Sequence, residues 1–220
     1  MMAVVFLFVL AIYFAALYKI SQFVYRGMFE RQKPKAAAWG ASVATFVVGL
    51  SLVFWDAIPT WYTHHHLCET EAGLKVYQTP EEWKQANPER YAQVKAAAGR
   101  EAKSRWEHGR DVKSFWTPLA LGFERESHDQ RAPTYAFHTG REQQRVVDKV
   151  TGKVLFESID FYSYAGKNSL AMGANSFDDY KFWTVTGSCE RAYPSMAEKF
   201  KHNGRTFNEI SNLIEDWNKK

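Results

Sequence analysis

Three consecutive histidines, His64, His65 and His66, are the most conspicuous candidates for chemistry in this sequence. Imidazole nitrogens bind transition metals, and they exchange protons near neutral pH. Successive side chains on a helix point about 100° apart, so the three rings do not converge on one ion. A metal site would combine His65 with Glu69, four residues further on, and a third ligand that is not found nearby. We therefore predict no cofactor, and an envelope enzyme or metal-binding protein that uses the histidines is the alternative function.

Carboxylates and serines elsewhere do not form a recognisable catalytic set. Asp178 and Asp179 are adjacent, and adjacent residues on a strand face opposite sides, so they do not straddle a substrate. Asp160 lies in an aromatic segment, and neither Ser169 nor Ser188 has the glycine-flanked elbow of a hydrolase nucleophile. We predict no catalytic residue.

The two cysteines, Cys68 and Cys189, form an even count, which permits one disulfide in an oxidising compartment. The alternative is two unrelated buried thiols. No CxxC spacing indicates a redox motif or a zinc knuckle. A bridge between Cys68 and Cys189 would join the far end of the chain to the segment that follows the histidines.

Two long apolar segments precede the histidines. Residues 36–55 carry no charge, and at about 1.5 Å per residue they match the hydrocarbon core of a bilayer. Residues 1–18 are also uncharged, and the side chain of Lys19 can reach the membrane surface. A cleaved signal peptide is disfavoured because no basic residue precedes Lys19. We predict spans at residues 3–25 and 36–58 and a loop at 26–35, which together form a transmembrane hairpin over residues 1–67.

Basic residues determine the predicted orientation of this hairpin. Arg26, Arg31, Lys33 and Lys35 cluster around the loop, and no Lys or Arg follows until Lys75. The positive-inside rule then places the loop in the cytoplasm and both chain ends on the other side. In a Gram-negative bacterium that side is the periplasm.

An aromatic collar follows the second span. Trp55, Trp61 and Tyr62 have the amphipathic rings that favour the headgroup layer of the bilayer. Five basic and two acidic residues lie in residues 1–68, so most of the net charge of +4 belongs to the membrane region. The nearly balanced remainder argues against nucleic-acid binding.

Residues 68–220 are predicted to form one α+β domain, an antiparallel sheet with flanking helices. Short aromatic and β-branched runs separated by turn residues begin at Phe115, and the clearest hairpin turns at Asp148–Lys153. The other predicted elements are a strand after Gly73, helices that begin at Pro80 and Pro88, the second including Trp106 and reaching His108, and a strand at 180–186. A closing helix from about Ser195 to Trp217 has an apolar stripe of Phe207, Ile210, Leu213, Ile214 and Trp217.

A long segment rich in Gly, Ser and Asn joins two of these predicted strands. Loops of this kind frequently carry binding residues, and exposed aromatic side chains anchor interfaces. The candidate contacts in this interaction loop are Tyr162, Tyr164, Leu170, Met172 and Phe177.

The runs WDAIPTWYTHHHLCETEAGLKVYQT, VVDKVTGKVLFESIDFYS and YKFWTVTGSCE resemble a family of small proteobacterial inner-membrane proteins. Members share an Ile-Pro span end, a Cys-x-x-Glu-Ala-Gly-like segment and a late Cys in the same order. The resemblance covers most of residues 50–190. It implies two N-terminal spans and a periplasmic domain, and it implies no catalytic residue because the family has no established activity.

These observations together predict a non-enzymatic protein of the bacterial inner membrane with its C-terminal domain in the periplasm. The domain would bind a protein partner in the envelope, as an accessory subunit of a complex or as an immunity or exclusion factor. The other predicted partner of the protein is the lipid bilayer, which would surround the transmembrane hairpin.

Overall fold

The computed structural model describes residues 2–31, 34–98, 103–109, 112–130, 138–164, 181–200 and 203–219. The chain divides into two units, Met1–Pro59 with Ala165–Thr184, and Thr60–Tyr164 with Val185–Lys220. The main division therefore falls at residues 59/60, whereas the sequence predicts it at 67/68.

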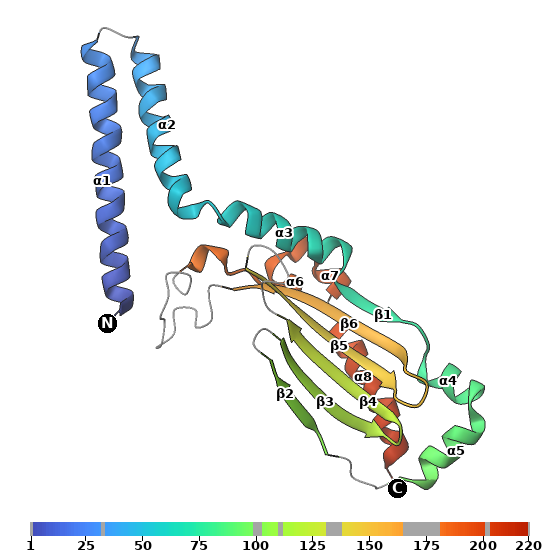
Figure 1. Cartoon of the computed structure of the whole chain (residues 1–220). Helices are drawn as coiled ribbons and strands as arrows, with labels where there is room; N and C mark the ends of the chain where they lie inside the picture. Colours follow the sequence, from blue (N-terminus) through green and yellow to red (C-terminus); the bar gives the residue numbers. More distant parts are fainter. Residues whose placement is uncertain are drawn as a thin grey trace. The chain divides into compact units, whose positions relative to one another are not determined.

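The first unit contains two antiparallel helices, α1 (Met2–Glu30) and α2 (Lys35–Phe54) (Figure 1). They pack closely at Gly49, where a Cβ atom would overlap the side chain of Leu17. Ser21 Oγ donates a hydrogen bond to the carbonyl oxygen of Ser42 over 2.8 Å. Small residues and polar contacts of this kind are typical of helix pairs in membranes. Both helices are long and apolar enough to cross one, by length and composition.

The helix ends differ from the predicted spans. α1 continues to Glu30, so Arg26 lies in the helix and not in the loop. Charged residues such as Arg26 do not by themselves end a helix, and α2 begins after Pro34, its N-cap residue. α2 ends at Phe54, four residues before the predicted end of the second span.

A buried ion pair follows the end of α2. Asp56 is 1% exposed, and its Oδ2 lies 2.8 Å from Lys181 Nζ. Trp183 Nε1 donates to Asp56 Oδ1 over 2.9 Å, from the short helix η2 (Phe182–Thr184). One buried carboxylate thereby joins the segment that follows α2 to the segment around η2.

An antiparallel sheet forms the second unit, in the order β1-β6-β5-β4-β3-β2, with β7 paired to β6. The predicted α+β class and antiparallel sheet are confirmed. The strands are β1 (Gly73–Val76), β2 (Arg105–His108), β3 (Val112–Ala120), β4 (Phe123–Gln130), β5 (Thr139–Asp148), β6 (Lys153–Ser163) and β7 (Gly187–Ser188).

Helices flank this sheet, and α8 (Asn203–Glu215) lies along one face of it (Figure 1). Phe207 of α8 packs against Phe156 of β6, with 5.2 Å between the ring centroids. The remaining helices are α3 (Ala57–Thr70), α4 (Pro80–Ala86), α5 (Pro88–Ala96), α6 (Cys189–Ala192), η3 (Pro194–Met196), α7 (Ala197–Phe200) and η4 (Asp216–Asn218). Thr79 and Glu82 form a capping box at the start of α4, which satisfies two backbone N–H groups there.

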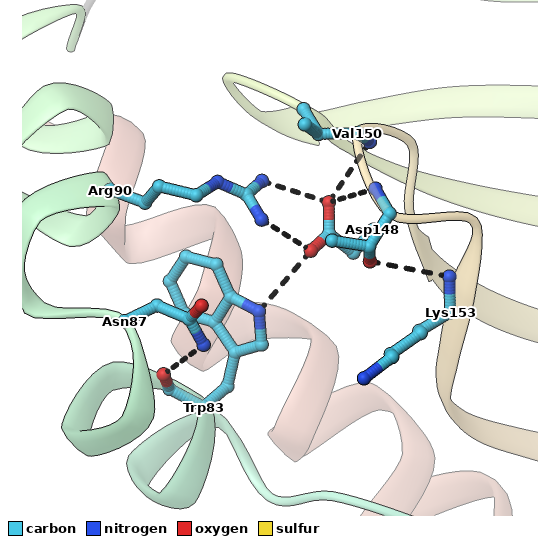
Figure 2. A network of polar contacts seen from close by, with 7 residues as sticks. Trp83, Asn87, Arg90, Asp148, Val150 and Lys153 are labelled. Atoms are coloured by element: carbon cyan, nitrogen blue, oxygen red, sulfur yellow. Dashed lines mark hydrogen bonds and ion pairs between the residues drawn. The ribbon is translucent and has the colours of Figure 1, made fainter.

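Asp148 begins the predicted turn between β5 and β6 and connects it to α4 and α5 (Figure 2). Its carboxylate, 1% exposed, accepts hydrogen bonds from Arg90 at 2.7 and 2.8 Å and from Trp83 Nε1 at 3.3 Å. Burial alone would raise the pKa of Asp148, but Arg90 and the turn's hydrogen bonds outweigh it and lower the pKa to about 2. The turn itself is confirmed, with Gly152 at a φ of 71° that glycine tolerates.

Three other sequence predictions are wrong. The second helix ends at Ala96, and Trp106 lies on β2, where its ring packs 4.0 Å from that of Phe115. Cross-strand aromatic packing thus overrides local helix propensity. The predicted strand at 180–186 is partly the 3-10 helix η2, with pairing only at β7. Leu213 of α8 is 44% exposed and lies outside the buried stripe.

Candidate functional site

One row of side chains crosses the whole sheet, with one residue from each of six strands directly opposite the next. The register of every strand pair places them in line, and we call them the cross-sheet row: Arg105, Trp116, Glu126, Arg145, Glu157 and Lys75. Glu157 follows Phe156, which packs under α8, and successive residues of a strand face opposite sides. The row therefore lies on the sheet face away from α8, here called the row face.

Direct contacts fix most members of the row. The guanidinium of Arg105 lies 4.3 Å from the centroid of the Trp116 ring, a cation–π contact. Arg145 Nε donates to Glu126 Oε2 over 2.5 Å. Glu157 accepts hydrogen bonds from two further side chains, Tyr77 Oη at 2.6 Å and Gln143 Nε2 at 2.8 Å. Opposite charges that face each other across strands stabilise a sheet, so the row supports the fold. Glu126 in its centre is 5% exposed, whereas Arg105 and Lys75 at its two ends are exposed.

The two glutamates of the row stay ionised over a wide pH range. Burial alone would raise the pKa of Glu126, but the hydrogen bond and charge of Arg145, with Lys149, hold it below its ordinary value. Hydrogen bonds from Tyr77 and Gln143 likewise hold the pKa of Glu157 below its ordinary value against the effect of burial. The alternating charges on this face are therefore fixed features near neutral pH.

Next to the row, Ser114, His128 and Glu126 lie in sequence like the members of a hydrolase triad. Ser114 Oγ is 2.9 Å from His128 Nδ1, and His128 Nε2 is 3.6 Å from Glu126 Oε2. In a triad the acid stabilises the imidazolium that forms during catalysis. Here Arg145 and Lys149 already compensate the charge of Glu126, at 2.5 and 3.5 Å. The arrangement favours a structural network over a nucleophile.

His64 is the one histidine of the triplet that is fully buried, and it lies beside the disulfide. Its Nε2 is 3.1 Å from the carbonyl oxygen of Phe161, so Nε2 donates. Nδ1 has one lone pair and accepts from one of the two hydroxyls beside it, those of Tyr193 and Thr186 at 2.9 and 3.1 Å. Burial lowers the pKa of His64 below its ordinary value. The ring is therefore a neutral, satisfied part of the core near pH 7.

Cys68 and Cys189 are bonded to each other, with 5.5 Å between their Cα atoms, and both are fully buried. His64, Cys68 and Cys189 are the only three potential metal ligands in the described ranges whose ligand atoms lie within 4.8 Å of one another. A metal would need free thiolates, which a disulfide lacks. His65 and Glu69 are both exposed on α3 and belong to no such group among the described residues.

A cavity of about 220 Å³ lies between α8 and the sheet, on the face opposite the row. Its wall includes Glu142 and Asp160, which face each other directly across β5 and β6, and Glu190. Burial raises the pKa of Asp160, the charges of Glu142 and Glu190 add to this, and backbone N–H groups of Cys189 and Phe161 offset it only in part.

We expect Asp160→Asn to stabilise the protein at pH 7. An acid whose pKa is raised in the folded state binds its proton more tightly there than in the unfolded chain, so its ionisation at neutral pH opposes folding. The asparagine keeps an oxygen that accepts the N–H groups of Cys189 and Phe161. Removing the repulsion between the like charges that face each other across β5 and β6 should raise the free energy of unfolding by about 0.2–1 kcal/mol. Urea unfolding should show this gain at pH 7 and a smaller one at pH 3.5; an equal loss at both values would contradict it.

The other predicted site residues fall in several places. Trp55, Trp61 and Tyr62 are 60%, 55% and 73% exposed, so their rings can contact the solvent or lipid around the protein. Tyr162 lies on β6, where its hydroxyl donates to Asp129, and Tyr164 follows the end of that strand. The remaining residues of the predicted interaction loop, Leu170, Met172 and Phe177, lie outside the described residues, as do Lys33, Ser169, Asp178 and Asp179.

The sequence analysis missed the row face, although a signal for it exists. The signal is the hairpin register and not β4 itself, because β4 is polar at every position from Glu124 to Gln130 and shows no alternation of apolar and polar residues. Arg145 and Glu157, the partners from β5 and β6, follow from the hairpin register once the turn at Asp148 is known.

Comparisons with protein-family models, with curated proteins and with solved structures returned no match.

Proposed function

We propose that this chain is a non-enzymatic protein of the bacterial inner membrane that presents its α+β domain in the periplasm and binds a protein partner of the envelope through the row face. The partner would make the chain an accessory subunit of an envelope complex or an immunity or exclusion factor. The cross-sheet row is the observation that carries the binding proposal.

Membrane insertion is supported by the surfaces of α1 and α2. Only 11% of the residues in the most apolar window of each helix are buried inside the protein. Large apolar side chains such as Phe8, Phe23 and Leu52 are 66%, 77% and 73% exposed. Soluble proteins rarely expose continuous apolar surface on this scale, so lipid is the natural surrounding phase.

The periplasmic location is supported by two independent features. Basic residues gather at the turn between α1 and α2, which favours a cytoplasmic turn. The disulfide between Cys68 and Cys189 belongs to the other unit and is typical of an oxidising compartment. Both features support the proposal that the sheet lies on the side of the membrane away from the cytoplasm.

The row face is suited to protein binding because its long side chains are already held in place. Ordering a flexible charged side chain on binding costs about 0.5–1.5 kcal/mol, and the direct contacts of Arg105, Arg145 and Glu157 reduce that cost. Alternating charges on a protein surface select a partner of complementary pattern more than they raise affinity. Exposed Arg105, stacked on Trp116, provides the aromatic and arginine pair that interfaces favour.

We expect photo-crosslinking from the row face to capture a discrete partner in cells that carry it. p-Benzoylphenylalanine in place of Trp116 should form one dominant adduct, whereas the same residue in place of Asn212, exposed on α8, should form none. Arg105→Glu should reduce the yield at least about fivefold, since like charges brought together at an interface cost several kcal/mol.

Arg205→Glu is the matched control, because Arg205 is an exposed arginine on α8. It makes the same charge change away from the row face and should leave the adduct unchanged. Equal adducts from positions 116 and 212, or equal loss with both arginine variants, would contradict binding through this face.

A further inference from the structure

A groove lies between α1 and α2. It has a volume of about 370 Å³ and is lined by Gln22, Tyr25, Arg26, Trp39 and Ser42. The first three are spaced by three and four residues on α1 and share one side of that helix, and the last two are spaced by three on α2. The groove is therefore formed by the facing sides of two adjacent helices.

Contacts between the helices fix the groove's inner wall. Ser21 Oγ lies 2.7 Å from Ser42 Oγ, which joins α1 to α2 at the level of the groove. Gln22 Nε2 donates to Tyr18 Oη over 2.6 Å, and Tyr25 stacks on Phe29 at 6.2 Å. These side chains are held, whereas Arg26 and Trp39 form the exposed rim.

Among the described residues that line the groove, Arg26 is the one with a charged side chain, and no described carboxylate forms an ion pair with it. A guanidinium presents five N–H donors in a plane and matches the oxygens of a phosphate group in a bidentate manner. The indole N–H of Trp39 and the amide of Gln22 are further donors beside it. The groove thus presents positive charge and donors to an anionic oxyacid.

The depth of the groove in the membrane and the apolar surface beside it indicate which anion the groove binds. Arg26 lies four residues before the end of α1 and Trp39 four residues after the start of α2, so both lie about 6 Å from the helix ends. A cytoplasmic turn would put this level at the headgroup layer. Trp39, Val43 and Val47 then continue toward the other end of α2 as an exposed stripe, 65%, 43% and 55% exposed, along which an acyl chain can lie.

We propose that this groove binds one anionic phospholipid, with the phosphate on Arg26 and an acyl chain along the stripe of Trp39, Val43 and Val47. The site rests on the membrane placement of the hairpin proposed above. Basic pockets between transmembrane helices on the cytoplasmic side bind the headgroups of anionic lipids, and one basic residue near the surface changes affinity about fivefold.

The test uses the full chain purified in detergent and titrated with phosphatidylglycerol or phosphatidylcholine, with bound lipid counted by native mass spectrometry. The wild-type chain should retain one phosphatidylglycerol with at least about fivefold preference. Arg26→Gln should abolish the preference, Arg26→Lys should reduce it because an ammonium lacks the bidentate fork, and Trp39→Leu should weaken retention of the lipid. Lys19→Gln removes a charge from α1 outside the groove and should change nothing.

Three results would overturn the site. Equal retention of the two lipids would show that the groove does not prefer an anionic lipid. An unchanged preference in Arg26→Gln would show that Arg26 does not bind the phosphate. Displacement of the lipid by millimolar inorganic phosphate would assign the groove to a free anion. Membrane fractionation separates this inference from the proposed function: a chain recovered as soluble protein contradicts both, whereas a membrane-embedded chain without lipid preference contradicts the groove alone.

Discussion

Replacing Cys68 and Cys189 together by alanine is expected to lower the free energy of unfolding of the sheet domain by about 4–5 kcal/mol. The disulfide joins residues that are 121 positions apart, and closing a loop of that length restricts the unfolded chain strongly in the chain-entropy model. Small domains have a total stability of about 5–15 kcal/mol, so the loss would be a large fraction of it. Urea unfolding followed by tryptophan fluorescence measures it.

The reduced wild-type protein is the matched control for this prediction. It retains both sulfur atoms and loses only the covalent link, so it separates the link from the packing of two fully buried side chains. Most of the loss should already appear on reduction. A loss below about 1 kcal/mol in both samples would show that the bridge adds little to stability, contrary to the chain-entropy expectation.

The second large effect is expected at Asp148. Asp148→Ala should destabilise the domain by about 3–5 kcal/mol, because it leaves the guanidinium of Arg90 without its buried partner. It also removes the hydrogen bond from Trp83 and the acceptor of the turn's Val150 N–H (Figure 2). Arg205→Ala, which breaks an exposed pair with Glu209, should cost less than about 0.5 kcal/mol.

A double-mutant cycle and a pH series make the Asp148 prediction specific. Asp148→Ala combined with Arg90→Met should cost less than the sum of the two single changes, because the unpaired charge is then gone. The folded pKa of about 2 lies below the ordinary 3.8, so this stabilisation is complete above about pH 5 and is lost as the pH falls toward 2. Additive single changes, or stability independent of pH between 5 and 2, would contradict the account.

Local signals in the sequence were sufficient for several elements. The turn at Asp148–Lys153 and the capped start of α4 at Thr79 depend on residues within six positions of one another, so the sequence predicts them. The two apolar helices follow from composition over about 20 residues. The cysteine pair follows from the even count and a predicted compartment, not from any local pattern.

Features that depend on long-range register were not predictable in the same way. The hydroxyl of Tyr77 meets Glu157 across 80 positions, and only the pairing of β1 with β6 brings them together. A shift of one residue in that pairing would send every side chain to the opposite face. His64 shows the same limit: its neighbours in the triplet are exposed, and only the position of α3 against β6 decides which of the three is buried.

Site-specific labelling tests the central claim, that the sheet domain and the turn between α1 and α2 lie on opposite sides of a membrane. The native cysteines are bonded and buried, so a new cysteine supplies the only free thiol. Asn212→Cys on α8 and Glu30→Cys at the end of α1 are both exposed positions. A membrane-impermeant maleimide applied to intact spheroplasts should label position 212 at once, and position 30 only after the membrane is permeabilised. Labelling of position 30 in intact spheroplasts with protection of position 212, or equal labelling of both, would contradict the account.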